Sequence, residues 1–155
     1  MKKLILSLVL VAGFFSAAAT YAETLPAAGV NVKSVKKIID GKYTAKIDKD
    51  SDIAITTENG IIYISVLKDV KLVRIFSIFK PYTQRSLAEV IVLANQFNNA
   101  KRLLRVYVLE DGGSSCDYYM TYDGGLNSEN LLSCMEWFCT MEQAWCEYVI
   151  NGGGE

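Results

Sequence analysis

Histidine is absent from this chain of 155 residues. Without an imidazole, the Ser–His and Cys–His pairs that activate catalytic nucleophiles cannot form, and a zinc site made of cysteine and histidine is excluded. The Gly-x-Ser-x-Gly motif of many hydrolases is also missing. We therefore expect a protein that is not an enzyme and that carries no cofactor.

Metal-binding patterns are incomplete as well. No two cysteines have the C-x2-C spacing, so a zinc site made of all four cysteines is only a formal alternative. The alternating carboxylates of residues 48–52 resemble a calcium loop, but Ile53 stands where the loop needs Gly, and Asn59 where it needs Glu. A solvated turn is the better interpretation, and we assign no metal ligand.

Basic residues are absent from residues 106–155, which carry nine of the 17 Asp and Glu residues. All 16 Lys and Arg residues precede this segment. A basic front half and an acidic back half indicate either charge pairing within the chain or a polar partner, with a merely solvated acidic helix face as the simplest alternative. For an exported chain, nucleic acid is not an expected target.

The first 22 residues have the pattern of a secretory signal peptide. Lys2 and Lys3 form a basic start, residues 4–15 form an apolar run too short to span a bilayer, and small residues lead to Ala22. No cysteine follows the run, so a lipid anchor is not indicated. We expect a periplasmic or secreted protein that leaves the membrane after cleavage.

The rest of the chain predicts one α+β domain at residues 32–150, between a flexible lead at 23–31 and a flexible tail at 151–155. Periodicity and capping signals predict helices at 32–39, at 87–99 after the capping box of Ser86 and Glu89, and from the N-cap Asn127 to Ile150. Strands are predicted at 43–47, 53–57, 61–67, 72–79, 103–109 and 116–122. We expect an antiparallel sheet with helices on one face, in the order helix, strands, helix, β-hairpin, long C-terminal helix.

Three stretches resemble the YbjN-like domains, which are bacterial proteins labelled as sensory transduction regulators. These are residues 93–98 (LANQFN), 105–112 (RVYVLEDG) and 122–131 (YDGGLNSENL). The resemblance covers residues 32–150 and implies a fold like that of type III secretion chaperones, without catalytic residues. Members of the family usually lack an export signal, so a cytoplasmic regulatory role is not carried over to this chain.

The four cysteines of an exported chain favour disulfide formation. Cys134, Cys139 and Cys146 share one predicted helix, where they would lie about 7.5 to 18 Å apart along the axis, at or beyond the reach of a bridge. A helix that runs back from Asn127 reaches the level of Cys116 after about 13 residues. We therefore predict a disulfide between Cys116 and Cys139, with four buried thiols as the alternative.

The last helix carries two apolar stripes. One broad face, which includes Leu131, Met135, Phe138 and Trp145, should contact the sheet. A second stripe is predicted to bind a partner or a second copy of the chain, unless another helix of the same chain covers it. Its members are Cys134, Trp137, Met141, Ala144 and Tyr148.

The sheet itself offers an alternative site. Alternation along the strands places rings and guanidinium groups together on the face that points away from the core, namely Tyr63, Arg74, Phe76, Arg105, Tyr107 and Tyr119. Such a face could bind a small ligand or a peptide, although these side chains could also simply cover each other across the strands. The sequence thus predicts an exported, non-enzymatic domain that binds a protein or itself, with ligand binding as the alternative.

Processing can be tested directly. Because the basic start, the short apolar run and the small-residue boundary follow the signal-peptide pattern, protein isolated from its native host should begin at Glu23, or at Thr20 if cleavage follows Ala19. Intact-mass measurement distinguishes these products. Recovery of the full-length chain from the cytoplasm would contradict both the predicted export and the expectation of disulfides.

Overall fold

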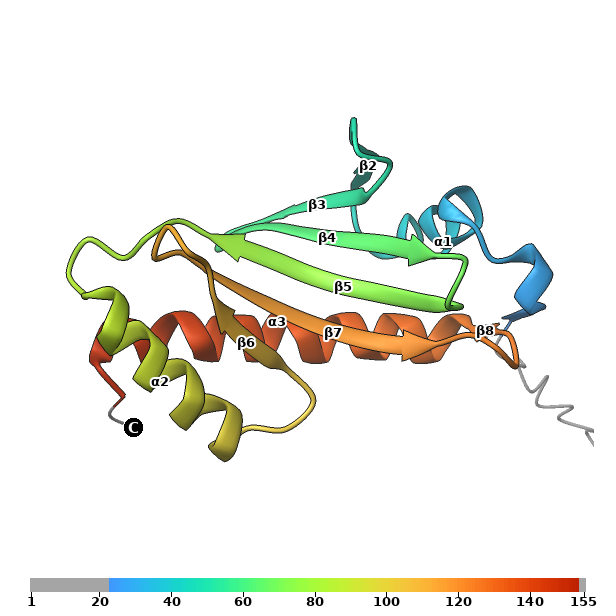
Figure 1. Cartoon of the computed structure of the whole chain (residues 1–155). Helices are drawn as coiled ribbons and strands as arrows, with labels where there is room; N and C mark the ends of the chain where they lie inside the picture. The colour runs from blue at the N-terminus through green and yellow to red at the C-terminus, as the bar shows by residue number, and fades with distance from the viewer. Residues whose placement is uncertain (1–22, 154–155) are drawn as a thin grey trace, which may run out of the picture.

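The computed structural model of the chain describes residues 23–153 (Figure 1). The predicted signal peptide and the last two residues lie outside the described residues. A six-stranded antiparallel sheet has the order β2-β3-β4-β5-β7-β6. Its strands are β2 (Ala45–Ile47), β3 (Ile53–Thr57), β4 (Gly60–Leu67), β5 (Leu72–Phe79), β6 (Arg105–Val108) and β7 (Ser114–Thr121).

Three helices pack against this sheet and confirm the predicted α+β order. They are α1 (Val32–Ile39), α2 (Leu87–Ala100) and α3 (Ser128–Asn151). The predicted capping box of Ser86 and Glu89 opens α2, and the side chain of Asn127 accepts a hydrogen bond of 2.8 Å from the Asn130 amide at the start of α3. Figure 1 shows α3 running along one face of the sheet, with α2 near its C-terminal end.

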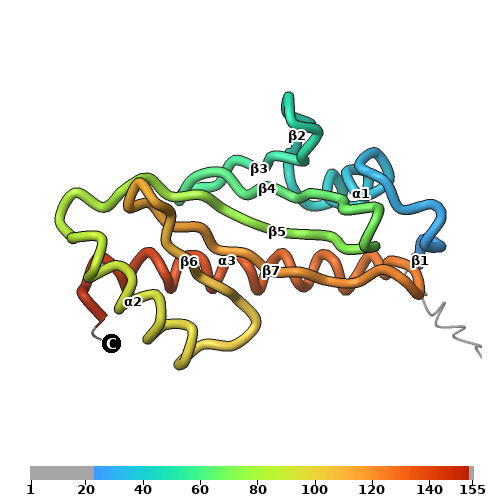
Figure 2. Tube along the Cα trace, in the orientation of Figure 1, coloured from blue at the N-terminus to red at the C-terminus, as the bar shows by residue number. Residues whose placement is uncertain are grey.

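Residues 23–31, for which the sequence predicts a flexible lead, adopt a regular conformation. They contain β1 (Thr24–Leu25), which pairs with β8 (Leu126–Asn127), and a short helix at Ala27–Gly29. The Cα trace in Figure 2 shows this segment beside the turn that leads into α3. A Cβ on Gly125, whose φ is +108°, would lie 2.8 Å from the Leu25 carbonyl oxygen. The close approach of β1 therefore requires glycine at this position.

The buried stripe of α3 recurs at alternating spacings of three and four residues and consists of Leu131, Met135, Phe138, Glu142, Trp145 and Val149. It faces the inner side of the sheet, where Ile64, Ile75 and Cys116 are fully buried. Helix α2 buries Val90, Leu93, Ala94 and Phe97, whereas Leu87 and Ile91 are exposed. Docking of α2 against both β6 and α3 rotates its buried side toward Leu93.

Glu142 is a carboxylate in the middle of this apolar stripe, and it is 1% exposed. Among residues 23–153, neither its Oε1 atom nor the Oγ atom of Ser77 on β5 has a hydrogen-bond partner. Burial raises the pKa of Glu142. The 3–4 spacing alone already places Glu142 with Phe138 and Trp145, so the sequence carried the signal that this side chain is buried.

We expect Glu142 to make the protein less stable as the pH rises. Its pKa in the folded state lies above the ordinary value of 4.5, so the folded protein retains a proton that the unfolded chain loses above that value. The free energy of unfolding should fall from that pH upward until the carboxylate ionises in the folded state, by at most about 1.4 kcal/mol per pH unit. Urea unfolding at pH 5 and pH 7.5 measures the change.

Glu142→Gln should remove this contribution, because its amide does not titrate. Glu147→Gln is the matched control, since Glu147 lies on the same helix but is exposed. If Glu142→Gln and Glu147→Gln alter the pH dependence equally, the buried carboxylate does not cause it.

Candidate functional site

Helix α2 covers only the C-terminal part of the second stripe of α3. At its C-terminal end, the ring of Tyr148 packs edge-on against Phe97 of α2, with 5.5 Å between the ring centroids. The Tyr148 hydroxyl donates a hydrogen bond of 3.3 Å to Gln96, and Ala144 is half-buried one turn earlier. At this end, another helix of the same chain covers the stripe. This is the alternative to partner binding that the sequence left open.

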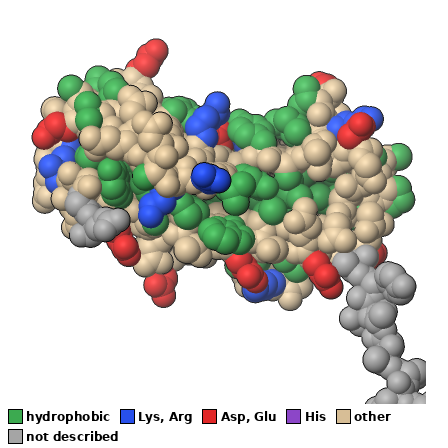
Figure 3. Space-filling model, turned by 90° about the horizontal axis from the view of Figure 1, so that it is seen from below, with side chains coloured by type: hydrophobic (Ala, Val, Ile, Leu, Met, Phe, Trp, Pro, Cys, Tyr) green, Lys and Arg blue, Asp and Glu red, His purple; other side chains and the backbone are tan. Residues whose placement is uncertain are grey.

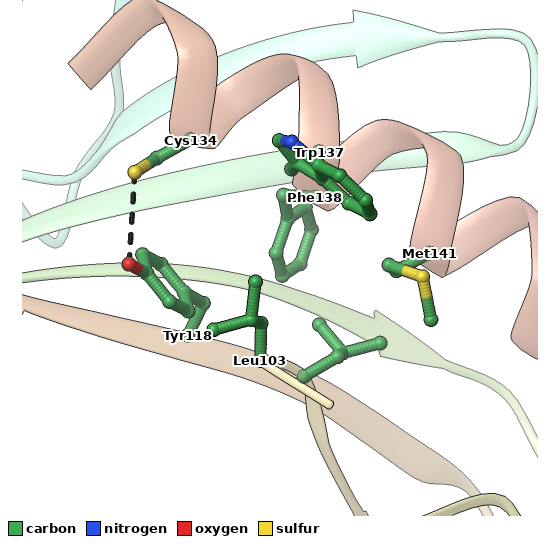
Figure 4. Close-up of a pocket in the computed structure, with 7 residues that line it drawn as sticks. Leu103, Tyr118, Cys134, Trp137, Phe138 and Met141 are labelled. Atoms are coloured by element: carbon green, nitrogen blue, oxygen red, sulfur yellow. Dashed lines mark hydrogen bonds between the residues drawn. The ribbon is translucent and has the colours of Figure 1, made fainter. Parts of the chain in front are cut away.

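The N-terminal part of the stripe borders an apolar groove (Figure 4). Cys134, Trp137 and Met141 line it from α3, together with the core residue Phe138. Leu103, Leu104 and Tyr118 line it from the turn before β6 and from β7. The hollow at its centre has a volume of about 50 Å³, which is room for the tip of one side chain.

Two large apolar side chains project into solvent at this groove. Trp137 is 57% exposed and Leu103 is 64% exposed. Leu103 also has a left-handed backbone conformation, with a φ of +72°, which is unusual for a bulky residue and costs conformational energy. The sequence predicts Leu103 in a strand, whereas β6 begins at Arg105 and Leu103 lies in the turn before it; neither Gly nor Asn occupies the left-handed position to mark this turn.

Basic residues flank the groove on one side. Lys101 and Arg102 are exposed and directly precede Leu103, whereas Glu136, which precedes Trp137 on α3, forms an ion pair with Lys42 on another side of the helix. Figure 3 views the molecule from below and shows apolar side chains at the surface in the middle of this face, with basic and acidic side chains nearby. The side of the groove formed by the turn before β6 is therefore basic in character.

Cys134 and Tyr118 meet at one end of the groove. The Cys134 thiol lies 3.6 Å from the Tyr118 hydroxyl, as the dashed line in Figure 4 indicates. The interaction with Cys134 and burial raise the pKa of Tyr118 to about 12, so the Tyr118 hydroxyl carries its proton at neutral pH. This contact supplies the groove with a polar edge.

The opposite face of the sheet brings together the six predicted residues Tyr63, Arg74, Phe76, Arg105, Tyr107 and Tyr119. A seventh residue, Asp117, lies at their centre and is only 1% exposed. Its carboxylate accepts hydrogen bonds from Arg74 Nε at 3.1 Å and from Arg105 Nη2 and the Tyr119 hydroxyl at 3.0 Å each. Asp117 is not among the residues predicted for this face, although its alternation with Cys116 and Tyr118 places it there.

Rings and guanidinium groups on this face cover each other. The Arg74 guanidinium lies 4.0 Å from the centroid of the Phe76 ring, which stacks on Tyr63. The Asp117 carboxylate raises the pKa of Arg105, so this guanidinium remains charged at every physiological pH. The contacts match the interpretation in which these side chains pack against each other across the strands. The charged and polar groups of this face largely find their hydrogen-bond and ion-pair partners within it.

The structure does not contain the predicted disulfide between Cys116 and Cys139. All four cysteines, which lie in the described part of the chain, are free thiols. Helix α3 faces the sheet with Glu142 near the register pair of Cys116 and Ser77, and it turns Cys139 toward Tyr43 and Lys42. The length of the helix predicted the residue of α3 at the level of Cys116 to within about one turn. It did not predict which side of α3 Cys139 occupies.

The described residues carry no group of three or more His, Cys, Asp or Glu side chains that could hold a metal ion. The acidic segment 48–52 forms a turn in which the Asp48 side chain accepts hydrogen bonds of 2.9 Å from the amides of Asp50 and Asp52. Within residues 23–153, none of the helices is sufficiently long and apolar to cross a membrane.

Comparison with known proteins fits this geometry. The profile of the YbjN family, described as "Putative bacterial sensory transduction regulator", matches residues 33–147. The chain belongs to the YbjN family. Among curated proteins, none matches the chain.

Two solved structures share the fold. "Crystal structure of YbjN, a putative transcription regulator from E. coli" is 7% identical, with a TM-score of 0.66 over 79% of this chain and 93% of that one. "Structure of the HopA1-SchA Chaperone-Effector Complex" contains a chain that is 13% identical, with a TM-score of 0.52 over 75% of this chain and 90% of that one.

The motifs that resemble the YbjN family have structural roles in this member. The side chain of Asn98 donates to the Val106 carbonyl at 2.8 Å and accepts from the Val106 amide at 2.9 Å. This pair of bonds closes the free edge of β6 against α2, which protects the edge strand from pairing with other chains. Gly125 has the structural role described above, in the approach of β1.

Replacing Asp117 should destabilise this YbjN-family domain. Asp117→Asn would leave Arg74 and Arg105 without a counterion, and we expect it to lower the free energy of unfolding by about 2–3 kcal/mol. Arg105→Gln should cost less than about 1 kcal/mol, because the Arg105 side chain is 62% exposed. Urea unfolding measures both variants. Equal effects would mean that Asp117 is not the centre of the network.

Proposed function

We propose that this YbjN-family domain is exported and binds protein through the groove between α3 and the turn before β6. The observation that supports this proposal is the exposure of Trp137 and Leu103 on either side of an apolar hollow. Side chains of this size at one exposed site are typical of the anchors of protein interfaces, and monomeric proteins usually hide such patches. The role is regulatory or chaperone-like rather than catalytic.

The size of the hollow favours a protein over a small ligand. Pockets for small molecules typically enclose about 300–1,000 Å³ and combine apolar walls with several convergent polar groups. The groove offers a hollow of about 50 Å³ with the Cys134–Tyr118 contact at one end. A single inserted side chain fits such a site, and the flanking surfaces of α3 and the turn would contact the rest of the partner.

The similarity to the chaperone fold agrees with protein binding. The HopA1–SchA structure is, by its title, a complex of a chaperone with an effector. That likeness concerns the fold, and the groove residues of this chain supply the specific argument. A role as a binding domain for another protein is therefore the function that fits both the fold and the surface.

A second copy of the chain is one partner that fits this surface. In a twofold interface the same patch must be complementary to itself, so that each copy supplies both a projection and a hollow. Trp137 and Leu103 project beside the hollow, so each copy supplies apolar projections as well as a hollow that can receive one. Self-association and capture of a different protein thus use the same residues.

Ligand binding on the aromatic face of the sheet is less well supported. The Asp117 carboxylate has its hydrogen bonds supplied from within the cluster, and the rings of Tyr63 and Phe76 stack on each other. Arg105 remains exposed and could contact an anion, but the described contacts do not leave an unpaired group that demands a ligand.

Trp137→Glu tests the groove. The residue is outside the core, so its replacement should change the free energy of unfolding by less than about 0.5 kcal/mol, yet abolish association. Ile78→Glu is a matched control, because Ile78 is also 57% exposed but lies on β5. Sedimentation of the purified protein and pull-down from periplasmic extract provide the readouts. Loss of binding in Ile78→Glu alone would favour the sheet face, and unfolding of Trp137→Glu would assign Trp137 to the core.

A second variant separates binding from stability. Leu103→Gly removes an exposed anchor and also relieves the left-handed backbone strain, since glycine adopts positive φ at little cost. We expect unchanged or increased stability together with weaker association. If Leu103→Gly binds as well as wild type, the turn before β6 is not part of the interface.

A further inference from the structure

The continuity of α3 limits how the cysteines can pair. Cys134, Cys139 and Cys146 lie on one uninterrupted helix, Ser128–Asn151. The closest two are five residues apart, about 7.5 Å along the axis, and they point to different sides of the helix. In the folded chain, an intramolecular disulfide therefore has to include Cys116, which is on β7.

Two of the three possible partners face elsewhere. Cys134 lies on the groove side, with its thiol 3.6 Å from the Tyr118 hydroxyl. Cys139 lies on the side of α3 that faces the connection between α1 and β2, where Lys42 forms an ion pair with Glu136. Neither side chain is directed at Cys116.

Cys146 lies within about one helical turn of the level of Cys116, because Glu142, four residues earlier on α3, lies near Cys116 and Ser77. The adjacent residue Trp145 donates a hydrogen bond of 3.0 Å from its indole nitrogen to Ser114 on β7. Ser114 and Cys116 are two residues apart and share the face of β7 beneath α3, where both are completely buried. The pKa values agree with this placement, because Cys146 contributes to the raised pKa of Cys116, and both cysteines contribute to that of Tyr82.

We propose that Cys116 and Cys146 form a disulfide that fastens α3 to β7 when the chain folds in an oxidising environment. The oxidant is a disulfide donor, such as oxidised glutathione or a disulfide-bearing oxidoreductase. One thiolate attacks the donor and releases a thiol, and the second thiolate then displaces the remaining donor thiol. Two protein thiols and one donor disulfide become one protein disulfide and two donor thiols.

The burial of the two cysteines determines when the disulfide can form relative to folding. Cys116 is inaccessible in the folded protein, and burial raises the pKa of Cys146 to about 11. Exchange requires an accessible thiolate, so folded and reduced protein should oxidise slowly. The disulfide therefore forms during folding, before α3 covers β7, and it is protected afterwards.

Peptide mapping tests the pairing. The full chain is unfolded, refolded with a mixture of oxidised and reduced glutathione, and blocked with iodoacetamide. Residues 106–155 contain no Lys or Arg, so trypsin cannot separate the cysteines, but a protease that cuts after glutamate can. Glu129, Glu136 and Glu142 divide the chain so that each cysteine has its own peptide. We expect the Cys116 peptide linked to the Cys146 peptide, with Cys134 and Cys139 alkylated.

Variants give a second readout that does not depend on mapping. Dithiothreitol should lower the urea midpoint of oxidised wild type and of the control Cys139→Ser, but leave Cys146→Ser unchanged. Because Cys146 is only half-buried, its replacement by serine should allow folding. Linkage of Cys116 to Cys134 or Cys139, or four alkylated cysteines after oxidative refolding, would overturn the proposal. This refolding test is independent of export and of the groove.

Discussion

Trp145 fixes the position of α3 on the sheet, and the rest of the structure depends on that position. Its indole nitrogen donates to Ser114 at 3.0 Å and to the Tyr82 hydroxyl at 3.1 Å, while its ring packs edge-on against Phe97 of α2. One buried side chain thus joins β7, α2 and the segment before α2. A displacement of α3 by one residue would break both hydrogen bonds and leave buried polar atoms unpaired, which costs more than the bonds themselves contribute.

Charge pairing links the basic front half of the chain to its acidic back half. Lys42 pairs with Glu136, and Lys71 with Asp123. These two pairs are about half-exposed and contribute little to stability, whereas Asp117 is buried between two arginines and contributes more. The asymmetry in the sequence is therefore explained in part by contacts within the chain. Lys101, Arg102 and the exposed Glu129 and Glu147 form no ion pair within residues 23–153.

The elements of the fold were predictable because each has a local cause. The capping box at Ser86 and the N-cap Asn127 predicted the starts of α2 and α3 to within about two residues. The residues that distinguish this protein depend on contacts between distant segments. Tyr148 is covered only because α2 returns over α3, and the turn at Leu103 takes a strained conformation that its sequence does not favour.

The groove exists because α2 is anchored at one end of α3. Arg85, just before α2, donates hydrogen bonds to the carbonyls of Val149 and Ile150 at 3.2 and 2.9 Å, and Asn98 near its end holds β6. Between these anchors α2 runs at an angle to α3 and diverges from it (Figure 1), and Trp137 remains exposed. The arrangement of the helices thus explains why the groove is open, but it does not explain why apolar side chains line the groove. A polar residue in place of Trp137 would remove no core contact, so stability alone does not explain an exposed tryptophan there, and a binding role does.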